Sequence, residues 1–215
     1  MKKLGVYDLV AVLLTGICIN ILIYSTIIFL FPDIASKWIV LKNIVFFLVF
    51  SYLVGIVVQE IGSFINSHIF DKKNKLLEKV FDGKEKYSLT EKERNEVQEI
   101  VKEELDFKEI PNEEICYNYC RYYLMKYGSM ARTDKDQSIA GMSRGLAIYF
   151  FLNGIFLFCY AILNEEIGLG IIVISLLSLV LGVLLYYRNI RFVKMRYLNI
   201  MRAAYYNYRI NGRDL

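Results

Sequence analysis

The sequence has few of the residues on which metal sites and disulfide frameworks depend. Among its 215 residues there are one histidine, His68, and four cysteines. Cys18 and Cys159 lie in apolar runs, whereas Cys116 and Cys120 are four residues apart, which is one helical turn. A zinc site with four ligands would need an unusual partner set here, and cysteines so placed do not form a disulfide framework. We expect no metal site and no cofactor.

The sequence also lacks the short motifs that carry common enzymatic chemistry. It contains no P-loop, no G-x-S-x-G turn, no H-E-x-x-H motif and no glycine-rich dinucleotide fingerprint. The spacing places His68 and Glu60 on one face of a helix, but an intramembrane hydrolase would also need a nucleophile or metal and an oxyanion stabiliser. We therefore expect a protein that is not an enzyme. A small lipid- or peptide-modifying enzyme is the least favoured alternative.

Apolar residues are abundant, at 56% of the chain, and they are gathered into runs. A run of about 20 residues can cross a hydrocarbon core of about 30 Å as a helix. The predicted fold is an all-α integral membrane protein with four transmembrane helices, over residues 7–31, 38–58 with an apolar continuation to 70, 145–163 and 170–187. The first run is too long for the apolar part of a signal peptide, about 7 to 15 residues, and is read as a retained helix.

These runs divide the chain into four parts. Transmembrane hairpin 1 covers residues 1–70, a helical cytoplasmic insert 71–144, transmembrane hairpin 2 residues 145–187, and a basic cytoplasmic tail helix 188–215. In the insert, a helix over 70–81 is expected to prolong the second transmembrane helix. A second insert helix begins at Thr90, with Glu93 in the capping-box position, and a third runs from Pro111 to Gly128.

Two insert helices have predicted buried faces. On the second, Val97, Ile100, Val101 and Leu105 follow the helical period. The third carries a broad stripe that is widened by Tyr122 and consists of Ile115, Cys116, Tyr119, Cys120, Tyr123 and Tyr127. Stripes of this kind usually pack in a core, so packing is the favoured interpretation and an aromatic ligand platform is the alternative.

The placement of lysine and arginine sets the expected orientation. The insert and the tail carry most of the cations, whereas the two loops inside the hairpins carry Lys37 as the sole clear cation. Because short basic loops stay in the cytoplasm, four crossings leave both termini there. We expect a multi-pass protein of the bacterial inner membrane. The abundance of lysine, isoleucine, asparagine, tyrosine and phenylalanine is typical of an AT-rich bacterial genome.

The tail mixes arginines with tyrosines next to the bilayer. It is expected either to continue the fourth helix or to lie in the interface with its arginines on anionic lipid headgroups. Lipid headgroups or a cytoplasmic protein are the expected partners, and no direct nucleic-acid contact is expected. The candidate partner-binding residues of insert and tail are Tyr119, Tyr122, Tyr123, Arg191 and Arg202.

Four polar residues fall near the middle of the four apolar runs: Asn20, Ser51, Asn153 and Ser178. An amide in hydrocarbon costs free energy unless it is hydrogen-bonded, so these side chains should face protein or water. The favoured interpretation is hydrogen bonding between helices, and the alternative is a polar conduction or gating layer.

Charged residues mark the inner boundary of the same helices. Glu60 lies near the end of the second run, with Arg144 and Arg188 as expected partners at that depth. One interpretation is a ring of carboxylates at a pore mouth or a gating ion pair, and the other is a carboxylate that reaches the surface.

Small residues precede the third run. Gly141 and Gly145 form a G-x-x-x-G pair, with Ser138 one turn earlier on the same face. Such faces let membrane helices approach closely, so the three residues are candidates for a helix contact, with a chance cluster as the alternative.

Together these patterns predict a non-enzymatic homo-oligomer that senses a cytoplasmic signal or partner and responds by gating or permeabilising the membrane. The alternative is a membrane anchor that recruits and regulates a soluble effector through its insert. In outline, four crossings with a cytoplasmic insert resemble membrane effectors and sensors of bacterial antiphage systems, which implies a role in antiphage defence.

Overall fold

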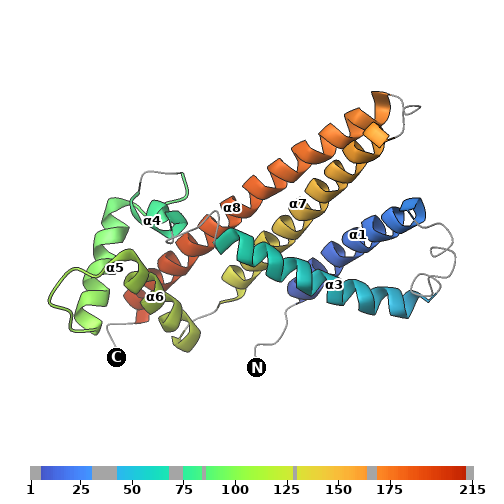
Figure 1. Cartoon of the computed structure of the whole chain (residues 1–215). Helices are drawn as coiled ribbons and strands as arrows, with labels where there is room; N and C mark the ends of the chain where they lie inside the picture. Colours follow the sequence, from blue (N-terminus) through green and yellow to red (C-terminus); the bar gives the residue numbers. More distant parts are fainter. Residues whose placement is uncertain are drawn as a thin grey trace. The chain divides into compact units, whose positions relative to one another are not determined.

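The structure is a computed structural model that describes residues 6–30, 43–67, 75–83, 86–127, 130–163 and 169–211. Within these ranges there are seven helices and no strand. They are α1 (Val6–Leu30), α3 (Ile44–Ile65), α4 (Lys75–Phe81), α5 (Glu91–Glu104), α6 (Glu113–Tyr127), α7 (Ala131–Leu163) and α8 (Leu169–Asn211) (Figure 1).

Four of the helices, α1, α3, α7 and α8, are long and apolar enough to cross a membrane, with mean hydropathies from 2.2 to 2.7 over an apolar stretch of 18 residues in each. Large apolar side chains cover their outer faces: Ile44 is 73% exposed, Leu163 74% and Leu169 78%. A continuous apolar surface of this kind is favourable in hydrocarbon and unfavourable in water. The prediction of an all-helical chain with four such helices is confirmed, and it indicates a multi-pass membrane protein.

The third membrane helix is longer than its predicted apolar run, and the fourth follows one of the two predicted alternatives by continuing into the tail. α7 begins at Ala131 rather than at residue 145, and α8 runs without a break through the basic tail to Asn211. The prediction placed helix ends where hydropathy changes, but a helix ends where its backbone is interrupted. No proline occurs in either helix, so the backbone bonding continues through the polar residues.

The second membrane helix is shorter at its start than predicted. α3 begins at Ile44, after the N-cap Asn43, whose side-chain oxygen accepts a hydrogen bond from the Val45 amide at 3.0 Å. The N-cap fixes the start because it satisfies a free amide of the first turn. α4 is described from Lys75 to Phe81, and the junction predicted to join it to α3 lies in residues 68–74, outside the described residues. Trp38, Lys37 and His68 also lie outside them.

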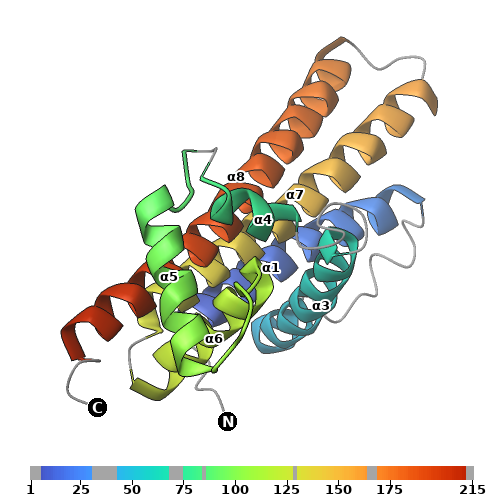
Figure 2. The ribbon, with the colours of Figure 1, turned by 90° about the vertical axis from the view of Figure 1, so that its left-hand side faces the viewer.

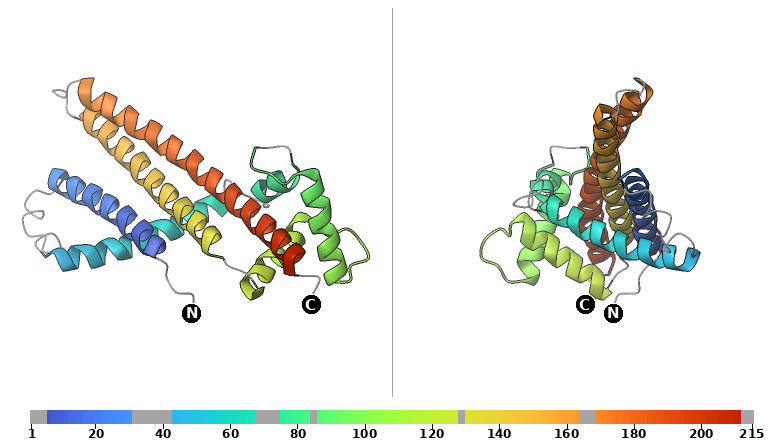
Figure 3. Two further views of the ribbon diagram at one scale, coloured as in Figure 1. Left: turned by 180° about the vertical axis from the view of Figure 1, so that it is seen from behind. Right: turned by 45° about the vertical axis from the view of Figure 1, so that its right-hand side comes forward.

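The chain divides into two compact units. Unit 1 consists of residues 1–67 and 138–189, and unit 2 of residues 68–137 and 190–215. α7 and α8 therefore each supply residues to both units. In unit 1, α1 pairs with α3, and α7 lies beside α8 as an antiparallel pair (Figures 1 and 3).

Backbone contact between α1 and α3 holds the first hairpin together. A Cβ added at Gly16 would lie 1.6 Å from the carbonyl oxygen of Ser51, and one at Gly55 would lie 2.1 Å from the carbonyl oxygen of Val12. Only glycine permits this approach, which replaces the hydrophobic drive that helices lack inside lipid. Gly16 and Gly55 were not predicted as contact residues, although Ser51 and Gly55 have the small-x-x-x-small spacing.

Unit 2 has its own hydrophobic core, in which α4, α5 and α6 surround the C-terminal part of α8 (Figure 2). The centre is fully buried and comes from every element: Val80, Val101, Cys116, Ile200 and Met201 are each 0% exposed. The insert thus obtains from the tail the apolar surface that three short helices cannot supply alone.

The predicted start of α5 is confirmed. The Thr90 hydroxyl accepts a hydrogen bond from the Glu93 amide, and the Glu93 carboxylate accepts one from the Thr90 amide at 2.8 Å, which completes a capping box. Val97 and Val101 are buried as predicted, but Leu105 is 45% exposed. Leu105 follows the last residue of the helix, where the backbone has turned away from the periodic face.

The predicted stripe on α6 is correct at its centre and wrong at one edge. Cys116, Cys120 and Tyr123 are buried, and so are Tyr117 and Leu124, which were not predicted. Tyr122 is 63% exposed, and the terminal Tyr127 is 46% exposed. Because successive helical residues are about 100° apart, Tyr122 lies nearly opposite the centre of the buried face.

Candidate functional site

The polar residues at the centre of α1 and α3 bind each other. The Asn20 side-chain amide donates a hydrogen bond to the Ser51 hydroxyl at 2.8 Å, and both side chains are buried. Ser51 also belongs to the glycine contact, so the bond forms where the two backbones are closest. This pair joins the two helices of the first hairpin.

The second hairpin has its own hydrogen-bonded chain. The Asn153 amide donates to the Ser178 hydroxyl at 3.1 Å, and this hydroxyl donates to the carbonyl oxygen of Phe150 at 3.0 Å. One turn away, the Ser175 hydroxyl donates to the carbonyl oxygen of Gly154 at 2.8 Å. The four mid-depth residues therefore form two pairs, each within one hairpin, which is the geometry of bonding between helices.

The small residues ahead of the third run contact the first hairpin. Ser138 donates a hydrogen bond to the Asp8 carboxylate, and a Cβ added at Gly145 would lie 2.5 Å from Thr15 Cγ2. Gly141 faces Gln59 of α3, at an ordinary distance of 3.7 Å from the Cβ position to Oε1. The structure thus places all three helix-contact candidates against α1 or α3.

Glu60 and Arg144 do not form the expected ion pair with each other. Arg144 donates to the backbone carbonyl oxygen of Gln59 at 3.4 Å rather than to a carboxylate. Glu60 is exposed and attracts Arg144 electrostatically without a salt bridge between these two described residues. Arg188 is exposed on α8. The structure brings Glu60 near Arg144 but makes a backbone oxygen the hydrogen-bond acceptor.

Polar atoms near this boundary are buried without a partner among the described residues. They include the Arg144 Nε, the Gln59 Nε2, the Ser143 hydroxyl and both amide atoms of Asn189. Asn189 is 0% exposed and Ser143 is 1% exposed. Gln59, Ser143 and Asn189 were not predicted as site residues, because polar side chains at the end of an apolar run ordinarily reach water.

The candidate partner-binding arginines of the tail make contacts inside unit 2. Arg202 forms a two-contact ion pair with Glu93, and its Nη2 also donates to the Ser88 carbonyl oxygen at 3.4 Å. The guanidinium carbon of Arg191 lies 5.2 Å from the ring centre of Tyr87. Both arginines thus join the tail to the insert.

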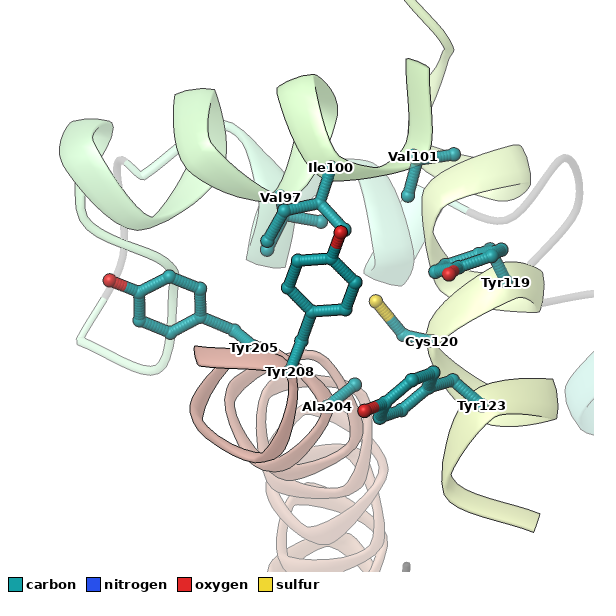
Figure 4. A pocket seen from close by; sticks show the side chains of 9 residues that line it. All are labelled: Val97, Ile100, Val101, Tyr119, Cys120, Tyr123, Ala204, Tyr205 and Tyr208. Carbon is teal, nitrogen blue, oxygen red and sulfur yellow. The ribbon is translucent and has the colours of Figure 1, made fainter. Parts of the chain in front are cut away.

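Tyrosines from α6 and α8 line a small recess in unit 2 (Figure 4). Its lining combines α5, α6 and α8 and consists of Val97, Ile100, Val101, Tyr119, Cys120, Tyr123, Ala204, Tyr205 and Tyr208. The cavity volume is about 10 Å³, which is room for no more than one water molecule. The rings of Tyr123 and Tyr208 meet edge to face at 6.0 Å. The recess is a packing interface of aromatic rings rather than a ligand platform.

The two cysteines of α6, Cys116 and Cys120, are free thiols in the core of unit 2. Burial, with Glu113 nearby, raises the pKa of Cys116 to about 12, and burial raises the pKa of Cys120 as well. Both thiols are therefore protonated at neutral pH, and a protonated thiol is neither a good nucleophile nor a metal ligand. In the described ranges no three histidine, cysteine or acidic side chains are grouped as metal ligands.

The site geometry consists of bonds between helices at mid-depth and unpaired donors at the inner boundary. Comparison with known proteins adds no functional information. No family model, no curated protein and no solved structure matches this chain.

Proposed function

We propose that this protein is a membrane anchor of the bacterial inner membrane that carries a folded helical unit on its cytoplasmic side and recruits a soluble protein there. The observation that carries the proposal is the core of unit 2. Insert residues such as Val101 and tail residues such as Met201 are buried together, at 0% exposure. A cytoplasmic segment with its own core is a binding domain in form, rather than a loop between crossings.

The same core supports the proposed orientation. In sequence, the insert precedes the apolar parts of α7 and α8 and the tail follows them, yet Glu93 binds Arg202. This contact supports placing the insert and the tail on one side of the membrane, with an even number of crossings between them. Their abundance of lysine and arginine favours the cytoplasm for that side, and with it both termini.

An anchor fits the mid-depth contacts better than a pore does. A conduction layer needs polar groups that are free to bind ions or water. Asn20 and Asn153 instead bind Ser51 and Ser178 within their own hairpins. Bonds of this kind stabilise the hairpins and leave the function to the surface of unit 2.

The exposed face of α6 is the proposed contact for the soluble protein. Tyr122 and Met125, one turn apart, are 63% and 65% exposed, so together they place two large side chains on the outer face of α6. Arg121 is exposed on the same helix and offers a charged control position. The expected partner surface is apolar, with an aromatic or methionine-rich pocket.

Cross-linking in cells tests the recruitment. A photo-reactive residue at position 122 should give one discrete cross-linked soluble protein, and Met125→Glu should abolish the product while Arg121→Gln should retain it. Asn153→Leu should reduce protein levels without changing the product per folded molecule. If no variant of unit 2 affects a cross-linked product, the recruitment proposal is wrong.

A gated channel made by several copies is the second candidate, and the exposure of Glu60 favours it. A carboxylate at the inner end of α3 could form a ring at a pore mouth in a homo-oligomer. Ion flux through vesicles that contain the purified protein, altered by Glu60→Gln, would establish this function in place of the anchor.

A further inference from the structure

Arg144 and Gln59 lie in a part of unit 1 where several buried polar groups lack a partner among the described residues. At mid-depth, the amides of Asn20 and Asn153 are hydrogen-bonded. At the inner boundary, the Nε of Arg144 and the Nε2 of Gln59 are buried and have no partner among the described residues. Buried donors in native structures almost always have an acceptor, so these two need one that the described residues do not supply.

The two donors lie close together on neighbouring turns of α3 and α7. Arg144 Nη2 is 3.4 Å from the Gln59 carbonyl oxygen. The Gln59 amide nitrogen lies 3.8 Å from the Cβ position of Gly141, one turn before Arg144 on α7. The Cβ position of Gly62 is 3.1 Å from Arg144 Nε, so the absence of a side chain at Gly62 makes room for the guanidinium.

Their depth is that of lipid headgroups. Arg144 precedes the mid-depth Asn153 by nine residues, and Gln59 follows the mid-depth Ser51 by eight. With a rise of about 1.5 Å per residue, both lie about 12 to 14 Å from the bilayer centre. The hydrocarbon core ends about 15 Å from the centre, and lipid phosphates begin just beyond it. A long arginine side chain reaches that level readily.

We infer that Arg144 and Gln59 bind a phosphate group, and that it belongs to an anionic phospholipid of the inner leaflet. Phosphate oxygens only accept hydrogen bonds, and the fork of an arginine matches them in charge and geometry. Water would satisfy the donors but not the buried positive charge. The inference rests on the proposed orientation only for the choice of leaflet.

Glu60 is the competing group. Its carboxylate, on the residue after Gln59, attracts Arg144 without binding it. The negative charge of Glu60 would repel a bound phosphate and so weaken the binding of the lipid. Glu60→Gln removes this repulsion. This gives the site a substitution that strengthens binding, which a purely structural role for Arg144 does not predict.

Native mass spectrometry of the full chain, purified in micelles that contain phosphatidylglycerol, tests the inference. Arg144→Gln should reduce the retained lipid about tenfold, as expected for loss of a charged hydrogen bond. Gln59→Met, which keeps the length of the side chain and removes the donor, should reduce it less. Arg188→Gln, a loss of charge on exposed α8 at a similar depth, should leave it unchanged, and Glu60→Gln should raise it.

Two results would overturn the inference. Equal lipid retention by the wild type and by both Arg144→Gln and Gln59→Met would show that the donors hold no phosphate; if Arg144→Gln does not fold, Gln59→Met decides. Displacement of the lipid by millimolar inorganic phosphate would assign the site to the free ion instead. Persistence of the lipid in that phosphate, and replacement of phosphatidylglycerol by other anionic lipids but not by phosphatidylcholine, support the lipid assignment.

Discussion

The Arg202 guanidinium donates two hydrogen bonds to the Glu93 carboxylate, from Nε to Oε1 at 2.8 Å and from Nη2 to Oε2 at 3.0 Å. The two residues are 109 positions apart, one in the tail and one in the first turn of α5. Glu93 also completes the capping box with Thr90, so one carboxylate holds the start of a helix and the tail together. The arginine side chain is 36% exposed and the glutamate 13%.

Arg202→Lys should lower the free energy of unfolding of unit 2 by about 1 kcal/mol. A lysine keeps the charge but cannot make both contacts, and it loses the bond to Ser88. Hydrogen exchange of the α5 amides in the full chain measures the change. Lys92→Gln is the control. The Lys92 side chain is 78% exposed and its Nζ lies 3.9 Å from Glu96 Oε1, a long ion pair, so its loss should have little effect. Equal exchange in Arg202→Lys and the wild type would contradict the prediction.

Acid should weaken unit 2 through the same carboxylate. Burial of Glu93 raises its pKa, but hydrogen bonds from Arg202 and Thr90 outweigh burial, so the pKa lies below the usual 4.5. A lowered folded pKa means that the stabilisation is complete above the unfolded value and is lost as pH falls through the folded one.

Exchange of the α5 amides should therefore be independent of this group above about pH 5, once corrected for the intrinsic rate, and should accelerate below about pH 4.5. In Glu93→Gln the acceleration attributable to this carboxylate should vanish, at the expense of lower stability near neutral pH. An identical acid profile in Glu93→Gln and the wild type would assign the acid response to other groups.

Gly16→Ala should unfold or separate the first hairpin. The new methyl group would lie 1.6 Å from the Ser51 carbonyl oxygen, so the two backbones must move apart. Overpacking of this kind costs about 1–3 kcal/mol or more. Gly170→Ala is the matched control, since no atom lies within 4 Å of its Cβ position. Thermal melting in detergent should drop for the first variant and stay or rise for the second; equal melting temperatures would mean that the backbones are not in contact.

Asn153 and Ser178 should be coupled energetically. Asn153→Leu and Ser178→Ala each remove a partner of the 3.1 Å hydrogen bond. A double-mutant cycle on the melting of the full chain should give a coupling of about 0.6 kcal/mol, the mean for membrane hydrogen bonds. Ser175→Ala serves as a control, because Ser175 binds the Gly154 carbonyl oxygen and should not couple to Asn153. A coupling of zero would leave the pair without a stabilising role.

Local features of this fold were predictable, and contacts between distant segments were not. The apolar runs and the Thr90 capping box depend on neighbours in sequence, and both are present. The ion pair of Arg202 with Glu93 and the backbone contact of Gly16 with Ser51 depend on which helices pack together. No periodicity within a single helix encodes that choice. Tyr122 shows the limit within one helix, because one position, or about 100°, is enough to carry its side chain off the buried face.

The candidate sites followed the same division. Hydropathy placed Asn20, Ser51, Asn153 and Ser178 at mid-depth, but only the packing shows that each asparagine binds a serine of its own hairpin. The unpaired donors of Gln59 and Arg144 could not be predicted, since an unmet hydrogen bond is a property of surroundings rather than of sequence.

The burial of Ile200 and Met201 at the centre of unit 2 has a consequence for biosynthesis. Ribosomes synthesise α4, α5 and α6 first, yet Ile200 and Met201, which complete their core, follow only after α7 and the apolar part of α8. The insert must remain incompletely folded, with its apolar faces accessible to chaperones, until the segment that contains Ile200 and Met201 has been synthesised. Truncation before Ile200 should therefore be as damaging to the insert as a lesion inside it.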